Sequence, residues 1–234
     1  MSIKEILKSG APELGVPLGD IEKLQIYYEL LERRNKEFNL TAITDETDAA
    51  QKHFLDSLGV LKSADFKGKS VIDVGCGAGF PGFPLKIAEP TISLTSVDST
   101  EKKVSFLMEV NAALSLDVNC LHARAEELGQ DPEYREKYDI AVSRAVARLN
   151  VLAELCLPLV RHGGKFLAMK ALDSDEEIEE AKPGIEKLGG IISRVDEYDI
   201  PGTDLRRRVV VIEKCRKTPE KFPRRFGTIK KQPL

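Results

Sequence analysis

Apolar residues recur at helical spacing near the start of the chain. Between residues 21 and 35 they occupy positions 21, 24, 27, 28, 30 and 31, and Asp20 stands before them as a helix cap. A second set at positions 54, 55, 58 and 61 predicts a helix over residues 49–62. Residues 1–66 are therefore predicted to form an N-terminal helical extension.

From residue 70 the pattern changes to short apolar runs that alternate with stretches of helical spacing. This alternation favours an α/β domain over residues 67–234, with a mostly parallel seven-stranded sheet and helices on both faces. The turn "PGTD" at residues 201–204 joins the last two strands and predicts an antiparallel C-terminal pair. The predicted strands cover residues 70–75, 92–97, 118–122, 139–143, 165–171, 191–198 and 207–214, and the predicted helices cover residues 82–88, 101–114, 149–159 and 174–188.

The composition is that of an ordinary globular protein, because 42% of the 234 residues are hydrophobic and 31% are charged. No run of eighteen apolar residues occurs, and the N-terminus lacks a signal-peptide pattern. We therefore expect a cytoplasmic protein without a membrane span, and a monomer. The cysteines at positions 76, 120, 156 and 215 form no CxxC pair, which favours free thiols and no metal site.

The acidic run "DSDEEIEE" at residues 173–180 is the one stretch that invites a metal-site interpretation. Ser174 and Glu177 have the spacing of a capping box, and acidic residues suit the start of a helix. We therefore interpret the run as a helix N-terminus.

Charge is distributed unevenly along the chain. Residues 205–234 contain eleven Lys and Arg residues and two acids, which is a net charge of +9. Because the whole chain has a net charge of −3, the other residues have a net charge of −12. A basic tail on an acidic body fits a polyanionic partner. A purely solubilising tail explains the composition equally well.

The stretch "VIDVGCGAGF" at residues 71–80 carries the clearest sign of a cofactor. Its glycines, Gly75, Gly77 and Gly79, lie between a predicted strand and a predicted helix. A dinucleotide-binding loop needs a further glycine where this chain has Phe80. Asp73 would also repel a pyrophosphate, which such loops hold with N–H groups and a helix dipole. S-adenosylmethionine has a sulfonium, an ammonium and no phosphate, so the pattern favours it over NAD.

Two further positions suit the nucleoside part of that cofactor. Asp98 ends the second predicted strand, where a carboxylate accepts hydrogen bonds from both ribose hydroxyls. The segment "HARAEEL" follows the third strand and places Ala125 and Glu126 where they can face the adenine. A tight strand-to-helix turn without any ligand is the alternative explanation of the glycines.

Several segments together resemble the ribosomal RNA small-subunit methyltransferase G family, also called the glucose-inhibited division protein B family. They are "RNKEFNLTAI", "HFLDSL", "DVGCGAGFPGFPLKI", "DSTEKKVSFL", "ARAEEL", "SRAVA" and the ending "KTPEKFPRRFGTIKKQPL". The resemblance runs from Arg34 to the C-terminus. Cys76, Phe83 and Arg34 depart from the family's pattern, in which we expect Thr or Ser, a smaller aliphatic and an aromatic residue.

The resemblance implies a class I S-adenosylmethionine-dependent methyltransferase, with a Rossmann-like fold. It implies methylation of guanine N7 in 16S ribosomal RNA, with the RNA or the small ribosomal subunit as partner. It also implies a set of cofactor-binding residues, namely Gly75, Phe80, Asp98, Ser99, Thr100, Ala125, Glu126 and Arg144.

Motifs that the chain lacks agree with this target. Methylation of an exocyclic amine usually employs an Asp/Asn-Pro-Pro-aromatic motif after the fourth strand, but that strand ends in Ser143-Arg144-Ala145 and no Pro-Pro occurs. Methylation of a pyrimidine carbon needs a cysteine nucleophile, typically beside a proline, and no such pair occurs. Guanine N7 has an exposed lone pair and no proton, so alignment and electrostatics suffice. We therefore assign no catalytic base.

Arg144 is the best candidate for orienting the cofactor or the target nucleotide, because it ends the fourth strand. Its alternative is an ion pair with a carboxylate such as Glu126. Lys170 ends the fifth strand and is a candidate phosphate contact. His53 lies in the segment "HFLDSL", where an RNA contact and a helix-packing histidine are equally good interpretations.

Aromatic and basic residues alternate near the end of the chain, since Phe222 and Phe226 flank Arg224 and Arg225. This arrangement suits an unstacked RNA strand. The alternative is that these residues only attach the tail to the body. Three other functions remain as rivals: a methyltransferase of a protein or small molecule, a nicotinamide-dependent oxidoreductase, and a cofactor-binding regulator without catalysis.

Overall fold

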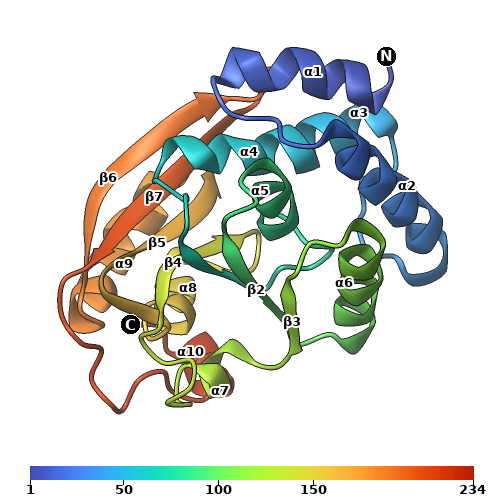
Figure 1. Ribbon diagram of the computed structural model, residues 1–234. Coiled ribbons are helices and arrows are strands. Elements are labelled where there is room, and N and C mark those ends of the chain that lie inside the picture. The colour runs from blue at the N-terminus through green and yellow to red at the C-terminus, as the bar shows by residue number, and fades with distance from the viewer.

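Seven strands form one sheet in the computed structural model, which describes residues 1–234 (Figure 1). Their order is β3-β2-β1-β4-β5-β7-β6; the first five strands along the chain run parallel, and β7 is antiparallel to both β5 and β6. The predicted fold class and all seven predicted strands are thus confirmed. The strands are β1 (Ser70–Val74), β2 (Ser93–Asp98), β3 (Asn119–His122), β4 (Tyr138–Arg144), β5 (Val160–Ala171), β6 (Gly190–Asp199) and β7 (Arg206–Lys214).

Helices cover both faces of the sheet, because its central strands are apolar on both sides. In β1, Val71 packs into a cluster of 39 buried residues on one face, and its neighbour Ile72 packs into a cluster of 26 on the other. The first cluster includes residues of α5 (Gly82–Ala88) and α6 (Glu101–Leu114), and the second includes residues of α8 (Leu149–Cys156), α9 (Asp175–Lys187) and α10 (Phe226–Lys231). The short helix α7 (Ala125–Leu128) follows β3.

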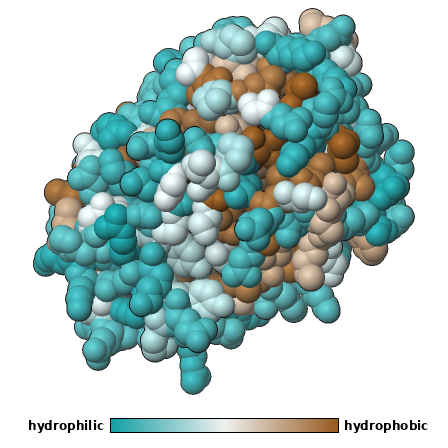
Figure 2. Space-filling model, in the orientation of Figure 1, coloured by the Kyte–Doolittle hydropathy of each residue, from teal (hydrophilic) through white to brown (hydrophobic).

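The N-terminal extension packs onto the first of these faces. Its apolar side chains belong to the same cluster as those of α5, α6 and the sheet. Apolar surface shows mainly on the half of this face that the extension, α5 and α6 form (Figure 2). The elements are α1 (Ile3–Leu14), α2 (Ile21–Phe38), α3 (Glu46–Ala49), the π-helical turn η1 (Ala50–Leu55), α4 (Asp56–Gly59) and the 3-10 turn η2 (Val60–Lys62).

The sequence pattern missed α1, although Ser2 and Glu5 form a capping box at its start. The prediction of a capping box formed by Ser174 and Glu177 was wrong. The Ser174 side chain makes no cap hydrogen bond, and its hydroxyl is buried without a partner. Glu177 points instead to Lys170 and to the backbone N–H of Leu149. None of the helices is both long and apolar enough to cross a membrane.

Candidate cofactor and RNA sites

A cavity of about 310 Å³ opens at the carboxyl ends of β1, β2, β3 and β4. In the sheet, β1 has β2 on one side and β4 on the other, so the loops that leave β1 and β4 run in opposite directions. The cavity lies between these loops. Six of the residues predicted to bind the cofactor line it: Gly75, Asp98, Ser99, Thr100, Ala125 and Glu126.

The glycine loop after β1 has a left-handed backbone at each of its three glycines, with φ of 72° at Gly75, 58° at Gly77 and 99° at Gly79. A side chain at Gly75 would collide with Val146, which lines the cavity, and one at Gly79 would collide with the hydroxyl of Tyr27. The loop therefore needs glycine at these two positions for space as well as for backbone conformation.

Asp98 ties this loop to the end of β2. Its Oδ2 accepts a hydrogen bond from the N–H of Gly77 at 3.0 Å, and its Oδ1 accepts one from the N–H of Thr100 at 2.9 Å. Lys103 Nζ lies 3.5 Å from Oδ2. Each carboxylate oxygen still has a second lone pair. The carboxylate can therefore organise the loop and also accept hydroxyl donors from a ligand in the cavity.

Asp73 lies in β1 below the loop and is fully buried, outside the cavity wall. Its Oδ2 accepts a hydrogen bond from Gly82 N–H at 2.8 Å, at the start of α5, but its Oδ1 has no partner. Burial raises the pKa of Asp73 to about 7, against the opposing effects of the Gly82 hydrogen bond and the Arg144 charge. An orphaned buried carboxylate oxygen is uncommon in folded proteins. It fits a site whose ligand carries positive charge.

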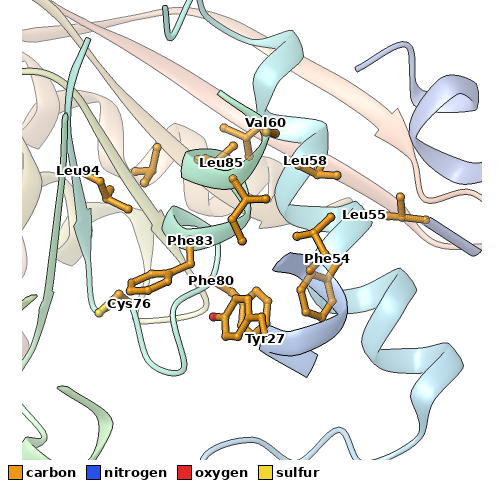
Figure 3. Packing of buried hydrophobic residues seen from close by; sticks show 14 of the residues in the cluster. Tyr27, Phe54, Leu55, Leu58, Val60, Cys76, Phe80, Phe83, Leu85 and Leu94 are labelled. Atoms are coloured by element: carbon orange, nitrogen blue, oxygen red, sulfur yellow. The ribbon is translucent and has the colours of Figure 1, made fainter. Parts of the chain in front are cut away.

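Phe80 contributes its side chain to the core and not to the cavity. Its ring stacks between those of Tyr27 and His53, with centroid distances of 5.2 and 4.5 Å. Figure 3 shows Phe80 beside Tyr27 and Phe54, within the apolar cluster beneath the N-terminal extension. If Phe80 contacts a cofactor, its backbone does so.

Arg144 also points toward the N-terminal extension. Its Nη1 lies 2.9 Å from Asp56 Oδ2 and donates to the carbonyl of Lys52 at 3.0 Å, and its side chain is 14% exposed. The ion pair that the sequence offered as an alternative is therefore present, but its acid is Asp56 and not Glu126. Asp56 also accepts a hydrogen bond from the Tyr198 hydroxyl at 2.9 Å. Sequence reasoning missed Asp56, although it lies within the segment "HFLDSL".

His53 lies against the same network. Its Nε2 is 2.8 Å from Thr41 Oγ1, its ring stacks on Phe80, and its Nδ1 is 3.4 Å from Arg144 Nη2. Burial, helped by the Arg144 charge, lowers the pKa of His53 to about 3. A neutral imidazole held in this way favours the packing interpretation over the RNA contact.

Lys170 has partners within the chain as well. Its Nζ lies 2.6 Å from Glu177 Oε1 and donates to the carbonyl of Ala147 at 2.8 Å, and its side chain is 11% exposed. A phosphate would have to compete with both partners. This placement favours a structural role for Lys170.

The two arginines near the C-terminus differ sharply. Arg224 binds the carboxylate of Glu154, with Nε 2.8 Å from Oε1 and Nη2 2.6 Å from Oε2, and Glu154 is completely buried. Arg225 is exposed and makes no ion pair. Arg224 therefore attaches the tail to α8. This favours the alternative in which these residues only attach the tail to the body. Arg225 stays a candidate for a phosphate contact.

The two flanking aromatic residues also have different surroundings. Phe222 is buried in the core, whereas Phe226 is partly exposed and lines the cavity at the carboxyl ends of the strands. Sequence reasoning did not place Phe226 there, because nothing in the local pattern shows that the end of the chain returns to the carboxyl edge of the sheet.

Comparison with known proteins identifies close relatives. The family model described as "rRNA small subunit methyltransferase G" matches residues 20–205. The chain is 47% identical to the ribosomal RNA small subunit methyltransferase G of Acetivibrio thermocellus, over 100% of this chain and 98% of that one. It is 48% identical to the protein of the same name from Pelotomaculum thermopropionicum, over 99% of each chain.

Solved structures agree on the fold. An S-adenosylmethionine-dependent O-methyltransferase from Thermotoga maritima superposes with a TM-score of 0.54 at 13% identity, over 81% of this chain and 73% of that one. TrmN from Thermus thermophilus superposes with a TM-score of 0.52 at 22% identity, over 68% of this chain and 48% of that one. At such low identity these likenesses show the fold alone.

Proposed function

The chain belongs to the ribosomal RNA small subunit methyltransferase G family, and we propose that it transfers a methyl group from S-adenosylmethionine to N7 of a guanine in 16S ribosomal RNA. The main support is the cavity at the carboxyl ends of the strands, which brings together the glycine loop, Asp98 and the segment after β3. The relatives' shared name supplies the class of substrate.

Each part of the cavity suits one part of this cofactor. Asp98 would accept hydrogen bonds from the ribose hydroxyls, and Ser99 and Thr100 line the same cavity. Ala125 and Glu126 would face the adenine. The backbone of the glycine loop is available to the methionine part. The Asp73 carboxylate is buried behind this loop, and its charge would favour the ammonium through space.

The cofactor supplies an electrophilic methyl group, so the chain has to hold the acceptor in line with it. Guanine N7 offers a lone pair without a proton, and no residue has to act as a base. The cysteines near the site do not suit the alternative chemistry at a pyrimidine carbon. Cys76 and Cys156 are buried, and burial raises the pKa of both thiols well above the ordinary value.

RNA contacts are proposed for the exposed side of the tail, with Arg225 as the leading residue. A cation there would hold phosphate and keep positive charge away from the guanine, which becomes cationic on methylation. A monomer acting in the cytoplasm is part of this proposal, since one chain builds the whole cavity and ribosomal subunits are its substrate.

The test is methyl transfer from labelled S-adenosylmethionine to small ribosomal subunits, and to free 16S RNA, that lack the modification. Nucleoside analysis should place the label in 7-methylguanosine. An Asp98→Ala protein serves as the control with a weakened cofactor site. Label in another nucleoside, or in ribosomal protein, would overturn the proposed target. Binding of NADH would support the oxidoreductase alternative.

A further inference from the structure

We propose that Phe226 at the start of α10 forms the adenine-side wall of the cofactor cavity, so that the C-terminal segment belongs to the cofactor site. This inference rests on the proposed function, because it takes the ligand to be S-adenosylmethionine. It gives the aromatic residue a partner other than an RNA base.

Phe226 stands at one end of the cavity. The cavity that contains Asp98 and Glu126 adjoins a second cavity of about 490 Å³, and the two share only Glu126 and Phe226. Arg224 and Arg225 line the second cavity but not the first. Phe226 therefore lies where the cofactor cavity meets the basic tail, next to Glu126.

The ribose position determines which part of the cofactor reaches this end. Asp98 would hold the ribose at the end of β2, and the adenine is bonded directly to that ribose. The adenine would then extend along the wall formed by Ala125 and Glu126, the first residues of α7. Phe226 lines the cavity beside Glu126, where an aromatic ring can stack on the purine.

The ring is held in place before any ligand binds. Arg224 joins the preceding turn to Glu154 of α8, and the neighbouring Leu155 also lines the cofactor cavity. Gln130 Nε2 donates to the carbonyl of Pro223 at 2.8 Å. Ile229 anchors α10 in the core. An aromatic side chain fixed in this way loses little further freedom on binding, which favours affinity.

The first experiment measures binding of S-adenosylhomocysteine and of adenosine by calorimetry. Phe226→Ala should weaken both by a similar factor, about 5- to 150-fold for one lost base–aromatic stack. Phe226→Leu keeps apolar bulk without the ring, so it should fold normally and still bind more weakly. Thr228→Ala is the matched control, since it changes an exposed residue of the same helix outside both cavities and should leave both affinities unchanged.

Three results would count against the inference. If folded Phe226→Ala and Phe226→Leu bind both ligands as the wild type does, Phe226 does not contact the adenine. If those variants lose only RNA binding, the ring stacks on an RNA base. If the wild-type protein itself fails to bind S-adenosylhomocysteine, the proposed function fails instead, and the two failures are thereby distinguished.

A second experiment uses the absence of tryptophan from the chain. Phe226→Trp introduces a single fluorophore, whose emission should change when S-adenosylhomocysteine stacks on it. Lys221→Trp places the same fluorophore on an exposed tail position outside both cavities, and its emission should stay constant. Unchanged emission of the Phe226→Trp protein, while calorimetry shows normal binding, would overturn the assignment.

Discussion

Replacing Asp73 with Asn should abolish a pH dependence that we expect in cofactor binding. Asp73 is buried, and one of its oxygens has no partner. Burial raises its pKa to about 7, from the ordinary value of 3.8. The folded protein without cofactor therefore retains the Asp73 proton over a range in which the unfolded chain has lost it. Asn keeps the shape and the acceptor for Gly82 N–H but has no charge.

The sign follows from these two pKa values. Because the folded state binds more protons between about pH 4 and about pH 7, the contribution of Asp73 to the free energy of unfolding is present at low pH and is lost as the pH rises through 7. The loss is about 4 kcal/mol at most. The positive charge of a cofactor ammonium at the glycine loop would recover part of it through space, so binding should favour the ionised form.

The expected magnitude can be stated for binding itself. With a pKa of about 7, only about one tenth of the Asp73 carboxyls are ionised at pH 6 and almost all at pH 8. Affinity for S-adenosylhomocysteine should thus be about tenfold weaker at pH 6 than at pH 8. The Asp73→Asn protein should bind weakly and equally at both pH values.

Calorimetry at several pH values, on the wild type, Asp73→Asn and a control, provides the measurement. Asp139→Asn is a suitable control, because it replaces an acid at the opposite end of a neighbouring strand. Although burial raises the pKa of Asp139, hydrogen bonds from Ser70 and Arg161 outweigh it and hold the pKa below the usual value. Equal pH profiles for wild type and Asp73→Asn would refute the reasoning. A dependence shared by both would come from another group.

Three other predictions concern single side chains. Asp98→Ala should weaken S-adenosylmethionine binding by about 1–3 kcal/mol through lost ribose hydrogen bonds, and unchanged affinity in calorimetry would remove Asp98 from the site. Arg144→Ala should lower the free energy of unfolding by about 1–3 kcal/mol, since it removes the nearest cation from the buried Asp56 carboxylate and leaves Arg207 at 3.5 Å; denaturant unfolding that matches the wild type would contradict this. Arg224→Ala should destabilise the fold similarly by isolating Glu154, whereas Arg225→Ala should leave stability unchanged and lower the log–log salt slope of RNA binding by about 0.7.

Most of the fold could be predicted because its signals are local. Apolar runs of strand length, a glycine loop and helical spacing each occur within a few consecutive residues. The meeting of the candidate cofactor residues could be predicted for a related reason. Parallel strands end at the same edge of the sheet, so the residues that follow β1, β2 and β3 must meet there whatever the details of packing. Gly75, Asp98 and Glu126 do meet at one cavity.

The networks that hold Arg144 and Arg224 could not be predicted in the same way. Arg144 and Asp56 are 88 residues apart in the chain, and Arg224 and Glu154 are 70 apart. Their pairing depends on how the extension and the tail dock on the sheet, and no local pattern encodes that docking. The long side chain of an arginine at the end of a strand can extend in several directions. Its position in the chain suggested a contact with the cofactor, but it could not show which direction the side chain takes.

The basic tail shows what a charge count leaves out. Of its eleven positive side chains, five form ion pairs with acids elsewhere in the chain: Arg206, Arg207, Arg208, Lys214 and Arg224. These pairs present a dipole to an approaching RNA instead of a free cation. The six others, Arg216, Lys217, Lys221, Arg225, Lys230 and Lys231, are the ones available for phosphates. If all six bound single-stranded RNA, their contribution to the log–log salt slope would reach about 4, which sets an upper limit for the tail. A slope change above that limit on replacing these six residues with alanine would mean that the replacements had also displaced cations on the body of the protein.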